Sequence, residues 1–122
     1  GCCKFMGMTL DAKEWSDITS ALTGWRFGVD EFRKTGERIY NLERSFNVRE
    51  GLGREHDTLP KRLLEDPLPE GPAEGHVNNL DMLLDPYYKY RNWDTVTGKP
   101  TPAKLKELDL ADVVPHIWEG QE

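Results

Sequence analysis

Two adjacent cysteines, Cys2 and Cys3, are the only cysteines of the 122-residue sequence. Adjacent cysteines rarely bond to each other, because disulfide geometry needs a Cα separation that a trans peptide does not comfortably allow. We therefore expect at least one free thiol or one thiolate ligand. Lys4 favours the thiolate, the form that both reactivity and iron ligation require. Two thiols cannot complete a multi-thiolate metal site, so on these residues alone an inert terminal thiol is the simpler interpretation.

The other groups able to do chemistry do not gather into a recognisable site. The three histidines are far apart, and none has a His, Cys or Glu neighbour at a spacing that zinc sites use. We interpret these residues as surface groups: His56, His76 and His116. A run of aromatic side chains could line a cofactor pocket, but at helical spacing core packing is the better interpretation. The aromatic residues are Tyr87, Tyr88, Tyr90 and Trp93.

The spacing of apolar residues predicts two helices in the first part of the chain. The first starts with Thr9 or Asp11 as its N-cap and stops at Gly24. The second is the longest, begins after Gly28 and ends near Gly51. Its apolar stripe recurs at steps of three or four residues, and we expect it to form the centre of the core. The stripe comprises Val29, Phe32, Gly36, Ile39, Leu42 and Phe46.

Residues 51–76 are interrupted by proline and glycine, which predicts a long, ordered loop. Only Pro60–Glu65 suits a short turn of helix, with the proline at its first position. A loop of this length usually wraps a surface or reaches another domain. We expect its 51–75 portion to pack on other parts of a larger protein.

Helical spacing returns over residues 80–93, where Pro86 either kinks the helix or begins a second one capped by Asp85. Thr101, as an N-cap followed by proline, predicts a short helix. The tail over residues 110–118 is apolar enough to dock on the rest of the chain. The resulting class is all-α: a compact irregular helical bundle with a long Pro/Gly-rich ordered loop, forming a single domain over residues 1–122.

Composition limits the function classes. The net charge of −6, from 16 basic and 22 acidic residues, argues against a nucleic-acid partner, which needs clustered lysine and arginine. No apolar run approaches the roughly 18 residues that span a bilayer, and the start lacks the pattern of a secretory leader. We expect an intracellular, soluble protein with no membrane partner. The start at Gly1, without methionine, suggests a piece of a longer polypeptide.

Several segments resemble the C-terminal end of the aldehyde ferredoxin oxidoreductase family, over nearly the full chain. They are GCCKF, TGW, GERIYNLERSFNVREG, DTLPKRLLEDPLPEGP and LDMLLDPYYKYRNWD. Residues 37–44 and 57–62 are the most distinctive, because both their order and their distance fit the family. Similarity between unrelated helices would not reproduce the loop as well.

The resemblance implies a cytoplasmic, oxygen-sensitive oxidoreductase with tungsten or molybdenum on a pair of pterins and a nearby [4Fe-4S] cluster. Such enzymes oxidise aldehydes to carboxylic acids and pass electrons to ferredoxin. Three cluster thiolates come from elsewhere in the family's polypeptide, and the fourth lies in a motif Asp-x-x-Gly-Leu-Cys. Cys3 matches that ligand, Cys2 replaces the leucine, and both inherit contact with one pterin. The motif's Asp has no counterpart in this sequence.

Our first hypothesis is therefore the C-terminal helical domain of such an enzyme, contributing one cluster ligand and part of the pterin and substrate cavity wall. Its partners would be the N-terminal domains of the same polypeptide, ferredoxin and a small aldehyde. By itself the chain is expected to be inactive, with no catalytic residue assigned and no cofactor bound. The alternative is a free-standing helical interaction module without redox activity. A small thiol redox protein is disfavoured, because no Cys-x-x-Cys spacing is present.

Overall fold

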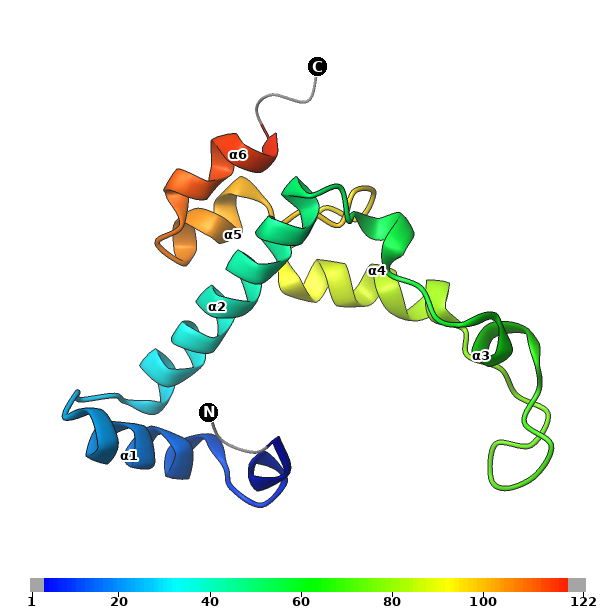
Figure 1. Ribbon diagram of the computed structural model, residues 1–122, viewed down its shortest axis with the longest axis horizontal. Helices are drawn as coiled ribbons and strands as arrows, with labels where there is room; N and C mark the ends of the chain where they lie inside the picture. The colour runs from blue at the N-terminus through cyan, green and yellow to red at the C-terminus, as the bar shows by residue number, and fades with distance from the viewer. Residues whose placement is uncertain (1–3, 119–122) are drawn as a thin grey trace. The chain divides into compact units, whose positions relative to one another are not determined.

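A computed structural model describes residues 4–118 of the chain (Figure 1). Over these residues it contains helices and loops and no strand, with one isolated antiparallel bridge between Trp93 and Pro100. The predicted all-α class is confirmed. The chain divides into two units, residues 1–40 and 41–122, which are described separately below. No helix in the described part is long and apolar enough to cross a membrane.

The first unit begins with a short 3-10 helix, η1 (Lys4–Met8), followed by α1 (Ala12–Thr23). Asp11 is the N-cap of α1, and its carboxylate accepts hydrogen bonds from the backbone N–H groups of Lys13 and Glu14 at 2.8 and 2.9 Å. The Glu14 carboxylate accepts the Asp11 N–H in return, which completes a capping box. Gly24 ends the helix in the left-handed conformation with φ 73°. The boundaries predicted from sequence are therefore confirmed.

Helix α2 (Val29–Arg49) contributes its last residues to the second unit, which continues through η2 (Arg54–His56) and α3 (Lys61–Glu65). Both short elements interrupt the stretch predicted as a loop. The short helix expected after residue 60 is present, with Pro60 at its N-cap rather than inside its first turn.

Helix α4 (Leu80–Arg91) is continuous and contains Pro86, so a separate helix capped by Asp85 does not form. Helix α5 (Pro102–Glu107) starts as predicted, with the Thr101 hydroxyl accepting the Lys104 N–H at 3.2 Å. The chain then passes through η3 (Ala111–Val113) into α6 (Val114–Trp118).

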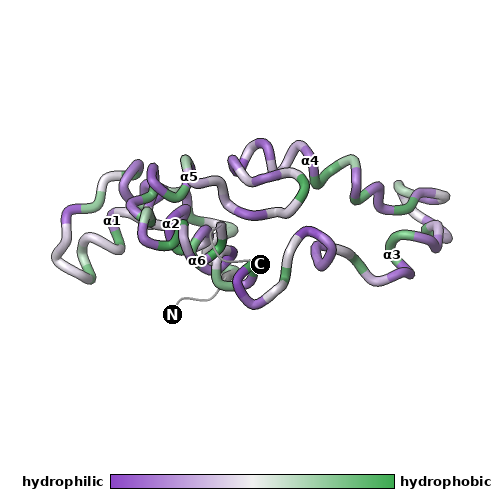
Figure 2. The backbone as a smooth tube through the Cα atoms, turned by 90° about the horizontal axis from the view of Figure 1, so that it is seen from above, coloured by the Kyte–Doolittle hydropathy of each residue, from purple (hydrophilic) through white to green (hydrophobic). Residues whose placement is uncertain are grey.

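The core of the second unit lies where the end of α2 meets α5 and α6 (Figure 1). Its buried members are Val48, Leu105, Leu108, Leu110 and Ile117. Docking of the apolar tail is thereby confirmed. Hydrophobic residues also occur outside this core, for example around α3 (Figure 2).

The expectation that the apolar stripe of α2 forms the centre of the core is wrong. Leu42 and Phe46 are 47% and 56% exposed, and Ile39 is exposed as well. The buried positions of this helix are instead Asn41, Ser45 and Val48. The periodicity was that of an amphipathic helix, but the side turned toward the second unit's own core is the one that carries two small polar residues.

Candidate functional site

A polar network in the second unit is built around an ion pair between Arg44 on α2 and Asp57 after η2. Two guanidinium nitrogens of Arg44 donate to the two carboxylate oxygens of Asp57, at 2.8 and 2.5 Å. The Arg44 side chain is only 10% exposed and that of Asp57 28%. Such a two-point contact fixes orientation as well as charge. It ties the loop after η2 to the long helix.

Two further residues complete the coordination of this pair. The Tyr88 hydroxyl, from α4, donates a short hydrogen bond to the Asp57 carboxylate. The third donor of Arg44, its Nε, reaches the carbonyl of Gly98 at 2.9 Å. Gly98 has φ 72°, and a Cβ placed there would overlap a guanidinium nitrogen of Arg44. Only glycine meets both the backbone and the packing requirement at this position.

The aromatic ring of Trp93 lies against the network. The Arg44 guanidinium lies 4.9 Å from the centre of the buried Trp93 ring, in the range of a cation–π contact. The Trp93 indole N–H donates to the Asn41 side chain at 2.7 Å, and Asn41 is fully buried. This hydrogen bond gives the buried amide a partner, so the polar face of α2 can be covered at little cost.

A second arginine, Arg54 on η2, borders the first. It donates to the Thr95 carbonyl and contacts the Asp85 carboxylate, both at 2.7 Å. Its guanidinium also lies 5.1 Å from the centre of the Tyr88 ring. Asp85 thus serves as an ion-pair partner across elements, and not as a helix cap.

The interactions within the network stabilise the charged forms of Asp57 and Arg44 and the neutral form of Tyr88. Burial disfavours charge on Asp57, but its hydrogen bonds from Arg44 and Tyr88 outweigh burial and lower its pKa below the ordinary 3.8. Burial likewise opposes the charge on Arg44, and the bonds to Asp57 still raise its pKa. Burial and the bond to Asp57 together raise the pKa of Tyr88 to about 12. At neutral pH neither Asp57 nor Tyr88 is suited to exchange protons with a substrate.

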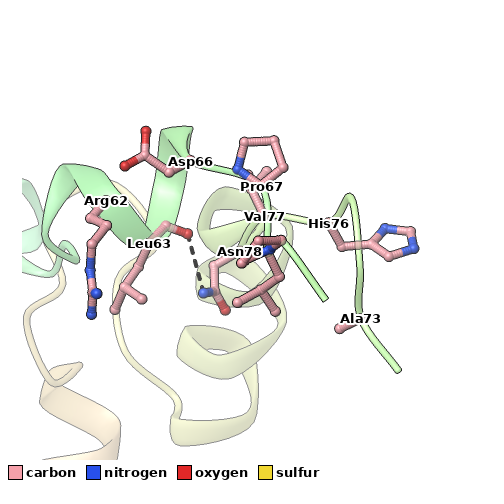
Figure 3. Close-up of a pocket in the computed structure, with 10 residues that line it drawn as sticks. Arg62, Leu63, Asp66, Pro67, Ala73, His76, Val77 and Asn78 are labelled. Atoms are coloured by element: carbon pink, nitrogen blue, oxygen red, sulfur yellow. Dashed lines mark hydrogen bonds between the residues drawn. The ribbon is translucent and has the colours of Figure 1, made fainter. Parts of the chain in front are cut away.

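Beside the network lies an open polar cavity of about 640 Å³. Arg54 and Asp57 form part of its wall, and the start of α4 forms another part, including Asn79 and Asp81. A second cavity, of about 420 Å³, lies between α3 and the loop over residues 66–78 (Figure 3). There Asn78 donates its side-chain N–H to the Leu63 carbonyl at 3.2 Å, which holds the loop against α3.

The predicted ligand residues cannot be compared with this network, because Cys2 and Cys3 lie outside the described residues. The histidines do lie in the described part and are exposed, as interpreted from the sequence. Over the residues described here, no group of three or more His, Cys, Asp or Glu side chains is placed to hold a metal. The predicted core role of the aromatic run is confirmed for Tyr88 and Trp93 but is wrong for Tyr90, which is 85% exposed.

Sequence reasoning placed Tyr88 among the core aromatic residues but did not single out Arg44 or Asp57. Arg44 sits one helical turn from the buried Asn41 and beside Ser45, so it belongs to a face that sequence patterning assigns to solvent. Arg44 and Asp57 do lie in the segments 37–44 and 57–62, which carry the family resemblance most distinctively. Their position in these distinctive segments was the sequence signal that could have pointed to Arg44 and Asp57, although it did not indicate their role.

Comparison with known proteins identifies the family to which these segments belong. Residues 1–110 match the family model described as aldehyde ferredoxin oxidoreductase, domains 2 and 3. The chain belongs to the aldehyde ferredoxin oxidoreductase family. The resemblance stated from the sequence is thereby confirmed.

Individual members of the aldehyde ferredoxin oxidoreductase family agree with this match. The tungsten-containing aldehyde ferredoxin oxidoreductase of Pyrococcus abyssi is 47% identical over 115 residues, which are 93% of this chain and 19% of that protein. The proteins of the same name from Pyrococcus horikoshii and Pyrococcus furiosus are 48% and 46% identical over 113 residues. The chain spans less than a fifth of the length of these relatives.

Proposed function

We propose that the chain acts as the C-terminal helical domain of a tungsten-containing aldehyde ferredoxin oxidoreductase, within a longer parent polypeptide. The observation that carries this proposal is the identity of 45–48% to four such enzymes over more than nine tenths of the chain. The parent polypeptide would oxidise aldehydes to carboxylic acids, use ferredoxin as its electron acceptor and work in the cytoplasm. Molybdenum in place of tungsten is disfavoured, because the names of all four relatives specify tungsten.

The cofactors that this proposal implies would be held jointly by this chain and by the rest of the parent polypeptide. A [4Fe-4S] cluster takes four thiolates, and the sequence has two cysteines. Cys3 would supply one thiolate, with the remaining three from the rest of the parent polypeptide, and Cys2 would lie beside a pterin. When bound, the cluster would carry electrons between the tungsten pterin and ferredoxin. Lys4 follows the ligand directly and its charge would favour the thiolate form of Cys3.

The described helices would then serve as scaffold and cavity wall. The network of Arg44, Asp57 and Tyr88 fixes α2, the loop after η2 and α4 to one another through charged hydrogen bonds. A support of this kind suits a wall that must hold its shape beside cofactors. The depressed pKa of Asp57 and raised pKa of Tyr88 agree with support and do not favour proton transfer.

The test compares Cys3→Ser with Cys2→Ser in the parent polypeptide, purified without oxygen. We expect Cys3→Ser to lose the cluster's broad visible absorbance and its paramagnetic signal after reduction, because oxygen is a poor substitute for a thiolate. Cys2→Ser should keep both, with four irons per chain. Retention of a normal cluster in Cys3→Ser would overturn the assignment of the ligand. A parent polypeptide that binds no iron at all would favour the alternative of an interaction module.

A further inference from the structure

An apolar groove lies between the C-terminal half of α2 and the η3–α6 segment. Its volume is about 310 Å³. The apolar lining comes from Leu42 and Phe46 of α2 and from Val113 and Ile117 of the tail. Leu42 and Phe46 are each about half exposed although they are large and apolar.

Two of the three polar side chains that line the groove, Ser45 and Arg49, have partners, and the third, His116, is exposed to solvent. The Ser45 hydroxyl in its lining donates to the Asn41 carbonyl at 2.8 Å. At the edge, Arg49 contacts the Glu50 carboxylate at 3.0 Å, and its guanidinium lies 5.0 Å from the centre of the Phe46 ring. A ligand is therefore not needed to satisfy a buried polar atom or an isolated charge. What the groove lacks is a partner that covers its exposed apolar side chains.

We propose that this groove, named here the α2–α6 groove, is the docking site for an apolar segment from the rest of the parent polypeptide. This inference rests on the proposed function and deepens it by naming the surface on which the remaining domains pack. Two observations select that occupant. The relatives carry more than four fifths of their length outside the matched part, and within the second unit Leu42 and Phe46 of α2 stay about half exposed.

The same occupant explains the amphipathic pattern of α2. Its small polar positions, Asn41 and Ser45, face the second unit and are satisfied there, whereas Leu42 and Phe46 stay open. One side of such a helix packs against its own unit, and a second side carries an apolar stripe. This pattern is typical of a helix that lies between two packed parts of a protein. An apolar helix or extended segment would fill the groove by contacts with both α2 and α6.

The experiment places the photoreactive residue benzoylphenylalanine at position 46 of the parent polypeptide, one copy per chain. After irradiation, digestion and mass spectrometry, we expect cross-linked peptides that join residue 46 to a segment outside residues 1–122 of the same chain. The matched control carries the same group in place of Lys106, an exposed charged residue of α5, and should give at least tenfold fewer such peptides. Position 42 provides a second site if the first variant does not fold.

Each outcome decides the inference. Covalent dimers joined at position 46 would assign the groove to a second copy of the chain and overturn the proposal. Reaction with solvent alone, equal to that of the Lys106 control, would show an uncovered groove and overturn it too. The cluster measurement on Cys3→Ser is independent of both readouts. An incorrect ligand assignment and an incorrect docking surface therefore give different patterns of failure.

Discussion

At the scale of single residues, the second unit depends on a carboxylate that is held by three donors. Asp57 accepts from two nitrogens of Arg44 and from the hydroxyl of Tyr88. Removing one member of such a set leaves the others with unmatched charge in a mostly covered place, which costs more than the net value of the bond. Substitution of Asp57 therefore tests whether the network stabilises the fold.

Asp57→Asn is expected to lower the free energy of unfolding by about 2 kcal/mol, since it leaves the Arg44 guanidinium without its counter-charge. The loss should be measured by urea denaturation followed by tryptophan fluorescence. Asp81→Asn is the control, because Asp81 is exposed and its change should stay within about 0.5 kcal/mol. Equal effects of the two substitutions would contradict a special role for Asp57.

The pKa shift of Asp57 gives this comparison a pH dependence. Its folded-state pKa lies below the ordinary 3.8, so its contribution is fully present above that value and is lost as the pH falls through the folded-state pKa. The difference in unfolding free energy between the wild type and Asp57→Asn should therefore shrink below about pH 4. A difference that stays constant down to pH 2 would argue against an ionised Asp57.

Tyr88 makes the opposite prediction at alkaline pH. Its pKa rises from 10.0 in the unfolded chain to about 12 in the fold, so the folded state keeps a proton that the unfolded state releases. The associated stability is present below pH 10 and falls as the pH rises from 10 toward 12. Tyr88→Phe should flatten this slope in urea titrations. Tyr90→Phe is the control, because Tyr90 is 85% exposed.

At the scale of elements, the sequence predicted local structure well and burial less well. The ends of α1 followed from Asp11 and Gly24, and the start of α5 from Thr101, because capping is decided by neighbours in the chain. The buried side of α2 could not be predicted in the same way. Apolar periodicity indicates that one side of a helix is buried, but it does not indicate whether the residues that bury it belong to the same unit.

The candidate site shows the same limit. Arg44, Asp57, Tyr88 and Gly98 come from four separate stretches of the chain, and their pairing depends on tertiary contacts that no local spacing encodes. Periodicity identified Tyr88 only as a core residue, and neither periodicity nor motif search identified the other three. The segments that carry the family resemblance do include three of the four residues, Arg44, Asp57 and Tyr88, because the resemblance reflects the whole fold at once.

The loop over residues 94–99 is an element whose geometry can be tested through Gly98. Gly98→Ala should destabilise the protein by about 2 kcal/mol or more, because a left-handed backbone and an overlap with the Arg44 guanidinium both oppose a Cβ. Gly71→Ala is the matched control, with φ 92° and no neighbouring atom within 4 Å of the added carbon. It should cost only about 1 kcal/mol, measured by thermal unfolding. Equal losses would show that backbone strain, and not the packing against Arg44, decides the requirement.

At the scale of the whole molecule, the described part has a small core and much open apolar surface. Exposed large side chains occur on α1, α2 and α4, including Leu22, Phe46 and Leu83. A family member that spans less than a fifth of its relatives would be expected to show such surface, because burial in the parent polypeptide is shared among domains. The cofactor chemistry should be shared in the same way.

Anaerobic addition of iron and sulfide to the 122-residue chain is accordingly expected to give no stable [4Fe-4S] cluster. Cys2 and Cys3 are the only thiols of the chain, and adjacent residues cannot reach four corners of a cluster. After desalting, the visible absorbance should fall to that of a chain with both cysteines replaced by serine. The parent polypeptide, treated identically, should retain about four irons per chain. A stoichiometric cluster on the short chain, held by one copy or between two, would contradict the shared ligand set and make the chain a cluster-binding protein in its own right.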